Sequence, residues 1–338
     1  MSPTQHADGL LLRLAKEQNL HFPTHWYVDT DGEQFKGAWV MAPKRTGLMR
    51  DVHVADFAKL YPSIILSWNM SPETVAEDKR RPRQSFSLVK YSSIGTKEWR
   101  VPEGHCEAMK TEVVFRNEPR GLLCIALERM GELRSFWSKK KATLPKSSAE
   151  WKEADRRDMA YKIASNSFYG VSGSPFSRFF LREVAESCAQ QGVWLIEETI
   201  KAAGDRGFDV VYGDTDSLFV TGCSRPAFET FVSWCNTELY PALLKSKGCV
   251  YNFIKLDTEK GFDRLVMVSK KRYVGSYAYF KKTVVDSDTK PEIKGLEYKR
   301  GDTTRSHASC RRKQPTCCSA TSARRPTRSS RSSSWWRG

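Results

Sequence analysis

The pattern of hydrophobic and polar residues predicts a protein that mixes helices with strands. Apolar residues that alternate with polar ones, or run between turn residues, predict strands at 35–43, 51–57, 208–212, 217–221, 251–258, 262–268 and 272–280. Apolar residues spaced three and four apart predict helices at 118–141, 150–170, 178–204 and near 226–245, with a shorter helix opening at Pro62. Residues 72–116 mix Pro, Gly and Lys/Arg and are expected to be rich in loops.

Two of the predicted helices are expected to form an antiparallel hairpin. The segments 118–141 and 150–170 are separated by Pro-Lys-Ser-Ser at 145–148, which breaks the helical pattern. Gly170 is expected to end the second helix. The mixture of predicted helices and strands favours an α+β fold.

Length and composition are those of a globular protein. The 338 residues allow two or three domains, and 40% of them are hydrophobic. No run approaches the roughly 18 apolar residues that a membrane helix requires, and no secretory signal is recognisable. The nine cysteines lack paired Cys-x-x-Cys spacing and therefore predict buried thiols in a reducing compartment. We expect a protein that is not secreted.

The net charge of +16 is unevenly distributed along the chain. From Thr303 to Gly338 there are eight Arg, one Lys and no acidic residue, in a Ser/Arg-rich segment without hydrophobic periodicity. This composition predicts a disordered basic tail, which is either a nucleic-acid-binding arm or non-native sequence from a shifted reading frame. The smaller basic excess of the preceding residues favours a polyanionic partner.

The stretch Val-Val-Tyr-Gly-Asp-Thr-Asp-Ser-Leu-Phe-Val at 210–220 places two carboxylates inside an otherwise apolar segment. Gly213-Asp214 is a strong hairpin signal, so Asp214 is explained as a turn residue. Asp216 begins the second strand beside apolar residues and needs a cation or several hydrogen bonds. From this segment alone, a Mg²⁺ site and a structural turn are equally open.

A second carboxylate, Asp56, ends another apolar strand. Val52, Val54 and Asp56 share one face of that strand, because side chains repeat every two residues. If two strands of one sheet bring Asp56 and Asp216 together, a divalent cation between them relieves their repulsion.

A third segment offers groups that bind anions. Lys162, Asn166 and Tyr169 fall on one face of the predicted helix 150–170. The preceding helix carries Arg134 and the run Lys139–Lys141, which is more often a solvated face than a phosphate site. In a helical hairpin, Arg134 and Lys162 could converge on a triphosphate.

Five segments, in order along the chain, resemble the motifs of family B DNA polymerases. They are 56–65 (DFAKLYPSII), 162–170 (KIASNSFYG), 212–217 (YGDTDS), 270–273 (KKRY) and 294–300 (KGLEYKR). The resemblance covers residues 8–302 and implies an α+β fold. In it, a polymerase palm has an antiparallel sheet with helices on one face, and a helical hairpin is inserted as the fingers. The implied divisions are an N-terminal segment leading into the palm (1–50), palm (51–116), fingers (117–172), palm (173–302) and the basic tail (303–338).

The resemblance also implies the roles of individual residues. Asp56 and Asp216, with the backbone carbonyl of Phe57, would bind two Mg²⁺ ions, or Mn²⁺, with Asp214 in a supporting catalytic role. The residues implied to bind the nucleotide are Leu60, Tyr61, Arg134, Lys139, Lys162, Asn166 and Tyr169. Those implied to contact DNA are Gly170, Lys270, Lys271, Arg272, Tyr273 and Lys294. The ring of Tyr61 would leave no room for a 2′-hydroxyl.

The chain departs from the family pattern at several places. Lys59 stands where the family usually has a small polar residue, and the spacing from Arg134 to the lysine run differs by about one residue. The sequence at 299–304 differs from the usual paired arginines, so we expect the thumb to be missing or replaced by the basic tail. An Asp-x-Glu at 257–259 is expected to be an ordinary strand, and no proofreading exonuclease is expected.

The expected function is template-directed addition of dNTPs to a primer 3′-hydroxyl, in the cytoplasm or at the replicating genome. Primer-template DNA and dNTPs are the expected partners, with no membrane. A reverse transcriptase or RNA polymerase is a second reading of the same carboxylates, although adjacent aspartates would be more usual there. The chain could also be a truncated, non-catalytic DNA-binding fragment, or one half of a split polymerase. In a split polymerase, the exonuclease and the thumb would be on separate chains. Further partners to expect are such an exonuclease or thumb chain, or a processivity factor.

Overall fold

The computed structural model describes residues 3–21, 39–76, 105–108, 113–281, 283–285 and 289–296. The helices are α1 (Pro3–Glu17), α2 (Leu60–Ser67), α3 (Leu122–Ala142), α4 (Ala149–Gly173), α5 (Arg182–Asp205), α6 (Arg225–Trp234) and α7 (Tyr240–Ser246), with a 3-10 turn at Pro72–Thr74 and a π turn at Cys235–Leu239. The strands are β1 (Gly47–Phe57), β2 (His105–Ala108), β3 (Val113–Arg116), β4 (Asp209–Asp214), β5 (Ser217–Thr221), β6 (Leu256–Ser269), β7 (Arg272–Phe280), β8 (Thr283–Val284) and β9 (Glu292–Lys294). The predicted basic tail lies outside the described residues.

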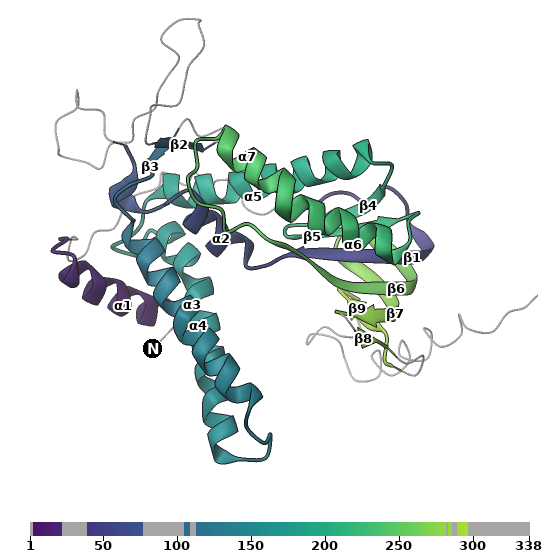
Figure 1. Ribbon diagram of the computed structural model, residues 1–338, viewed down its shortest axis with the longest axis horizontal. Coiled ribbons are helices and arrows are strands. Elements are labelled where there is room, and N and C mark those ends of the chain that lie inside the picture. The colour runs from purple at the N-terminus through teal and green to yellow at the C-terminus, as the bar shows by residue number, and fades with distance from the viewer. Residues whose placement is uncertain are drawn as a thin grey trace, which may run out of the picture.

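One antiparallel sheet organises the part of the chain that the structure describes. Its strand order is β4-β5-β1-β6-β7-β8, and β9 pairs with β7. Helices α5, α6 and α7 lie along one side of this sheet (Figure 1), with α5 against β4 and β5 and α6 against β1 and β6. The predicted combination of helices and an antiparallel sheet, with helices on one face, is therefore confirmed.

Both faces of the central strands are buried, which explains their nearly continuous apolar sequence. On one face Val210, Leu218 and Val220 join the core beneath α5 and α6. On the other face Tyr212 and Phe219 pack with residues of β6 and β7 in a second apolar cluster. The site carboxylates are thus attached to strands that are fixed from both sides.

The β6–β7 pair closes tightly because two glycines lie under aromatic rings. A Cβ atom at Gly275 would collide with the ring of Phe262, and one at Gly261 would collide with the ring of Tyr279. Glycine is required where a ring lies this close to the strand backbone. The close approach lets the second face of the sheet bury its own aromatic residues.

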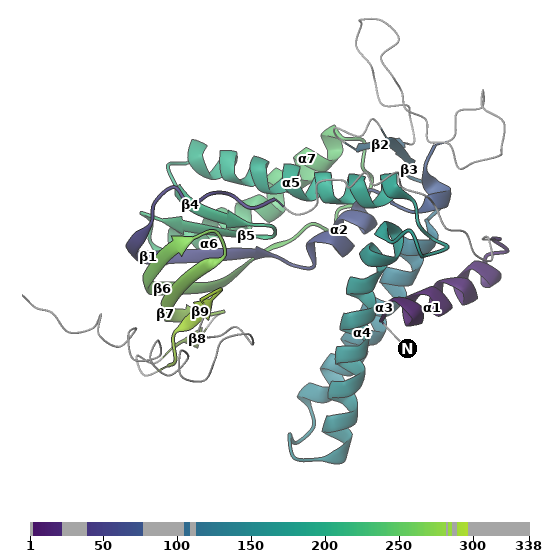
Figure 2. The ribbon, with the colours of Figure 1, turned by 180° about the vertical axis from the view of Figure 1, so that it is seen from behind.

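Helices α3 and α4 form the predicted antiparallel hairpin, which extends away from the sheet (Figure 2). Ser148 caps the start of α4 by accepting a hydrogen bond from the backbone N–H of Trp151 at 3.0 Å. The predicted end of this helix at Gly170 was wrong, because α4 continues to Gly173. The additional turn is held by the burial of Val171 and Ser172 against the core.

Two further predictions of elements were wrong. Of the predicted strand 35–43, residues 35–38 lie outside the described residues, and residues 39–43 form no regular strand. Val40 forms an isolated bridge with Asp214, and the N–H of Met41 donates to the carbonyl of Gly213 at 2.9 Å along the outer edge of β4. The predicted strands 251–258 and 262–268 are one strand, β6, which starts at Leu256. The helix predicted near 226–245 is confirmed as a continuous helical segment, in which the π turn at 235–239 joins α6 to α7.

No helix in the described part of the chain combines the length and the apolar character needed to cross a bilayer. The loop-rich prediction for 72–116 is tested only in part, because most of residues 77–112 lie outside the described residues. Within it, the short strands β2 and β3 form a separate antiparallel pair.

His53 makes the stability of the fold dependent on pH. Its Nε2–H donates to the carbonyl of Cys223 at 3.1 Å, and its Nδ1 accepts from the Tyr279 hydroxyl at 2.9 Å. This pairing requires the neutral ring, and burial is the main cause that lowers the pKa of His53 below its usual value, although Asp51 and Glu229 oppose it. The contribution of the neutral ring is therefore fully present above about pH 6.5 and is lost as the pH falls through the folded-state pKa.

We expect His53→Gln to lower the thermal stability at neutral pH and to have less effect in acid. The difference in unfolding free energy between wild type and variant should narrow as the pH falls from about 7.5 to about 5.5, because only the wild type loses the neutral ring. Denaturant titrations of both proteins at several pH values measure this difference. A difference that is constant with pH would contradict the assignment of a neutral His53.

Candidate active site

The fold brings Asp56, at the end of β1, close to Asp216, which lies in the β4–β5 turn just before β5. Asp56 ends β1 and lies opposite Ser217 in the β1–β5 ladder. The backbone N–H of Phe57 donates to the carbonyl of Asp216 at 2.7 Å, which ties the two ends together. Residues far apart in the sequence thus meet where β1 leaves the sheet and the β4–β5 turn begins.

Burial and like charge act together on these two carboxylates. Burial, followed by the negative charges of Asp216 and Glu259, raises the pKa of Asp56 to about 7, against the opposing effect of Lys260. Burial and the charge of Asp214 likewise raise the pKa of Asp216. A bound cation would offset the repulsion between these two adjacent carboxylates and stabilise their ionised forms.

The pair fits a hard divalent cation by its chemistry. Mg²⁺ binds through one or two carboxylates together with water and substrate phosphates, and Mn²⁺ uses similar oxygen ligands. Among the described residues, no group of three or more His, Cys, Asp or Glu side chains is arranged to hold a metal ion. The candidate metal ligands are therefore the carboxylates of Asp56 and Asp216, without a complete cage from the protein.

Asp214 lies in a different environment from the other two aspartates. Its carboxylate accepts from the ammonium of Lys271 at 2.8 Å and from the Thr215 hydroxyl at 3.1 Å. The backbone N–H of Lys271 also donates to the Tyr212 hydroxyl at 2.9 Å, so the β6–β7 turn is joined to the β4–β5 turn. The positive φ of 53° at Thr215 produces the tight turn that separates Asp214 from Asp216.

Sequence reasoning missed two acidic residues of β6 near this site. Asp257 lies opposite Asp56 in the β1–β6 ladder, and Glu259 contributes negative charge to both Asp56 and Asp216. The predicted strand at 257–259 is part of β6, but the prediction did not include the negative charge that Glu259 adds near Asp56 and Asp216. The alternating acidic residues at the start of this strand were the sequence signal that could have indicated additional negative charge near the site.

Tyr61 and Tyr169 stack face to face between α2 and α4. Their ring centroids are 4.4 Å apart with an interplanar angle of 8°. Burial raises the pKa of Tyr61 to about 12, so its hydroxyl stays protonated. A Cβ atom at Gly192 would lie 3.5 Å from the side chains of Tyr61 and Leu60, which shows how closely α5 supports α2. The side chain of Leu60 is buried in the core, so only its backbone could reach a nucleotide.

The cations of the helical hairpin are only partly where the sequence predicted them. Arg134 faces α4 and pairs with Asp158 at 3.1 Å. Lys141 turns toward α4 and pairs with the same carboxylate, whereas Lys139 is exposed and makes no ion pair in the described part of the chain. Lys162 and Asn166 are exposed on α4, as their shared helical face predicts.

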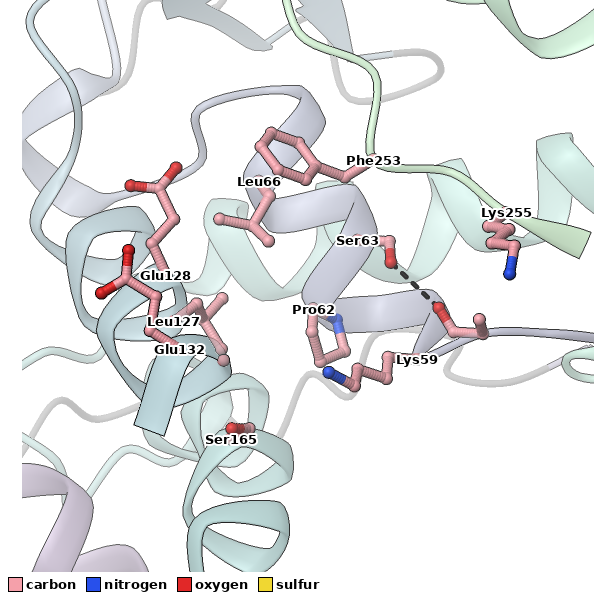
Figure 3. A pocket seen from close by; sticks show the side chains of 12 residues that line it. Lys59, Pro62, Ser63, Leu66, Leu127, Glu128, Glu132, Ser165, Phe253 and Lys255 are labelled. Atoms are coloured by element: carbon pink, nitrogen blue, oxygen red, sulfur yellow. Dashed lines mark hydrogen bonds between the residues drawn. The ribbon is translucent and has the colours of Figure 1, made fainter. Parts of the chain in front are cut away.

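Lys59 lines a cavity of about 410 Å³ between α2, α3 and α4. Its side chain runs beside Pro62 in this cavity (Figure 3), with Glu132 of α3 and Ser165 of α4 also in the wall. Burial, and then the positive charge of Arg134, lower the pKa of Lys59, while Asp158 opposes them. The unusual lysine of this motif therefore lies within electrostatic reach of the hairpin cations.

The segment implied to contact DNA forms the turn between β6 and β7. Lys270 and Lys271 are exposed there, and Lys294 on β9 lies opposite Tyr273. The ring of Tyr273 is buried and its hydroxyl donates to Glu292 at 3.2 Å, so this side chain is not available to a ligand. Gly170 is exposed on α4.

The chain belongs to DNA polymerase family B, because the sequence model of that family matches residues 4–326. The match extends beyond residue 302, where the resemblance of the motifs ends. It confirms the family that the five motifs indicated.

Individual relatives agree with this assignment. The chain is 29% identical over 307 residues to the DNA polymerase of Archaeoglobus fulgidus, covering 89% of this chain and 32% of that protein. It is 31% identical over 277 residues to DNA polymerase 2 of Aeropyrum pernix, covering 81% and 29%. The chain thus spans about a third of the length of these curated relatives.

A solved structure has the same fold. The family B DNA polymerase from the hyperthermophilic archaeon Pyrobaculum calidifontis superposes with a TM-score of 0.59 at 25% identity, over 94% of this chain and 38% of that one. The mixed helical and antiparallel architecture described above is therefore that of part of a family B polymerase.

Proposed function

We propose that this chain is the catalytic core of a template-directed DNA polymerase, which transfers nucleotides from dNTPs to the 3′-hydroxyl of a primer. The observation that supports the proposal is the meeting of Asp56, at the end of β1, with Asp216, just before the neighbouring strand β5, where burial and mutual repulsion favour a bound cation. We assign residues 51–116 and 173–302 to the palm, residues 117–172 to the fingers and residues 1–50 to a segment leading into the palm.

The carboxylates of Asp56 and Asp216, with the carbonyl of Phe57, would hold two divalent cations. When bound there, the cations would make the primer hydroxyl more acidic and neutralise charge on the leaving phosphates. Asp214 keeps Lys271 at the turn beside Asp216. Because phosphoryl transfer depends on positioning and electrostatics, the role of these residues is to fix the charges before the substrate arrives.

The stacked rings of Tyr61 and Tyr169 would form the floor under the sugar of the incoming nucleotide. Arg134 and Lys162 would bind its phosphates, and Asn166 would lie beside the nascent base pair. These residues come from α2, α3 and α4, which pack directly on one another. A nucleotide held between them is oriented toward Asp56, which lies just before α2.

DNA would be bound mainly through its phosphates. Lys270, Lys271 and Arg272 at the β6–β7 turn, with Lys294 on β9 and the backbone at Gly170, would supply these contacts. Such contacts give affinity without sequence preference and weaken steeply with added salt. This is suitable for an enzyme that must move along any template at the replicating genome.

A primer-extension assay with the purified chain tests the proposal. We expect dNTP addition on a DNA template that requires Mg²⁺ or Mn²⁺ and stops with EDTA, and that prefers dNTPs over rNTPs. Binding of the same primer-template is measured in parallel by fluorescence anisotropy. Binding without extension in the presence of either metal would overturn the proposal and favour a non-catalytic DNA-binding chain. Extension that appears only after a second polymerase chain is added would favour a split enzyme.

A further inference from the structure

Asp158 of α4 holds two cations of α3 at once. Its Oδ1 accepts from Arg134 Nε at 3.1 Å, and its Oδ2 accepts from Lys141 Nζ at 2.5 Å. Lys141 also pairs with Asp155 at 3.1 Å. Only 14% of the Asp158 side chain is exposed, compared with 27% for Arg134 and 23% for Lys141. The carboxylate thus forms a bridge that is shielded from water between the two helices of the hairpin.

The two cations share one face of α3 because they are seven residues apart, which is about two helical turns. Their positive charges need an anion between them, and Asp158 supplies it from the facing helix. The hydrogen bonds that it accepts lower the pKa of Asp158 despite its burial, so it stays ionised. The same bonds raise the pKa of Lys141. The cluster is therefore charged throughout, and Asp158 neutralises only part of its cations.

Other cations surround this cluster. Lys162 follows Asp158 by four residues on α4 and is exposed, without an ion pair among the described residues. Lys59, just before α2, is repelled by Arg134 and attracted by Asp158. Four basic side chains thus lie around Asp158, and this carboxylate together with Asp155 does not balance their charge. An anion with more charge and more oxygen atoms would satisfy the same donors better.

We propose that Asp158 takes the place of phosphate in the nucleotide-free chain, and that the incoming triphosphate displaces it from Arg134 and Lys141. Lys141, in place of Lys139, is then the second α3 cation of the nucleotide site. The inference rests on the proposed function for the identity of the ligand as a nucleotide. The bridge between the two cations rests on the contacts alone.

The exchange has a consequence for affinity. Because Arg134 and Lys141 must leave Asp158 before they bind phosphate, the nucleotide binds more weakly than it would to free cations. In return, the cations are already held on one face of α3 and need little rearrangement. A ligand with few negative charges would displace Asp158 poorly, so the device favours a triphosphate over a monophosphate.

Isothermal titration calorimetry of the whole chain with inorganic tripolyphosphate, without divalent metal, tests the exchange. Metal-free conditions separate the measurement from Asp56 and Asp216. We expect Asp158→Asn to bind tripolyphosphate about tenfold more tightly than wild type. The matched control is Glu153→Gln, which removes the same charge from a half-exposed position of α4 whose ion pairs, among the described residues, are with Arg156 and Arg157. It should change the affinity by less than about twofold.

The lysine assignment is tested in the same experiment. Lys141→Gln should weaken tripolyphosphate binding by about tenfold, and Lys141→Arg should retain it. Lys140→Gln is the matched control, because Lys140 is exposed and lies over the ring of Trp137. Equal effects of Lys141→Gln and Lys140→Gln would overturn the assignment of Lys141.

A purely structural role of Asp158 predicts the opposite sign. If Asp158 only stabilises the hairpin, Asp158→Asn loosens the hairpin and weakens tripolyphosphate binding, and this result would overturn the inference. The absence of any tripolyphosphate binding to the wild-type chain would also overturn it. Primer extension by the wild-type chain is measured separately. If the predicted binding pattern holds and extension fails, the proposed function is wrong while the inference stands. If extension succeeds without that pattern, the inference is wrong.

Discussion

Asp216→Asn should reduce primer extension by about a thousandfold while leaving primer-template binding nearly intact. The substitution keeps the shape of the side chain and removes the charge that, together with Asp56, would hold the divalent cations. Binding would depend on phosphate contacts at the β6–β7 turn, where Lys271 pairs with Asp214 and not with Asp216. Single-turnover extension kinetics and fluorescence anisotropy with the same DNA measure the two effects.

The stability of this variant separates lost chemistry from lost structure. Because Asp216 repels the neighbouring Asp56, removing its charge should leave the metal-free melting temperature unchanged or raise it. Asp209→Asn is the matched control, since Asp209 lies on the adjacent strand β4, pairs with Arg45 and should not affect extension. Extension by Asp216→Asn at close to the wild-type rate would remove the basis of the proposed function.

Tyr61→Ala should reduce the discrimination against ribonucleotides by about a hundredfold. The ring is fixed by its stacking on Tyr169 and by the close packing of α5 at Gly192, so it cannot move aside for a 2′-hydroxyl. Removing the ring opens that space, while the triphosphate contacts are unchanged. Single-nucleotide insertion with matched dNTP and rNTP gives the ratio of the two kcat/KM values.

The conservative variant defines the cause of this effect. Tyr61→Phe keeps the ring and should keep the discrimination, because exclusion of the 2′-hydroxyl is steric. If Tyr61→Ala selects dNTPs as strongly as wild type, the ring does not lie under the sugar. If Tyr61→Phe loses selectivity to the same extent, the hydroxyl acts through a hydrogen bond, contrary to the steric explanation.

Local sequence was sufficient to predict the helices and strands whose burial pattern is set within one segment of the chain. The strands predicted at 217–221 and 272–280 match β5 and β7 at both ends, and the helical hairpin has the predicted order and turn. The prediction failed where a distant partner decides the structure. Residues 39–43 alternate like a strand, but they follow the outer edge of β4 and form only a single bridge.

The residues of the candidate site were also predicted from local sequence, whereas their spatial neighbours were not. The sequence by itself determined the family and which residues are proposed to carry the chemistry, because the motifs around Asp56, Lys162 and Asp216 are continuous along the chain. Their spacing could not determine that β1 and β5 are neighbours, and the adjacency of the two carboxylates was expected from the resemblance to a family.

Only the tertiary structure decided which partner each charged group meets. It joins Asp214 to Lys271 across two turns and pairs Arg134 and Lys141 with Asp158. It also buries Tyr273, whose hydroxyl donates a hydrogen bond to Glu292. The physical reason is that periodicity records which face of an element is buried, whereas ion pairs and hydrogen bonds depend on distances between elements. Those distances are set by how the whole chain packs.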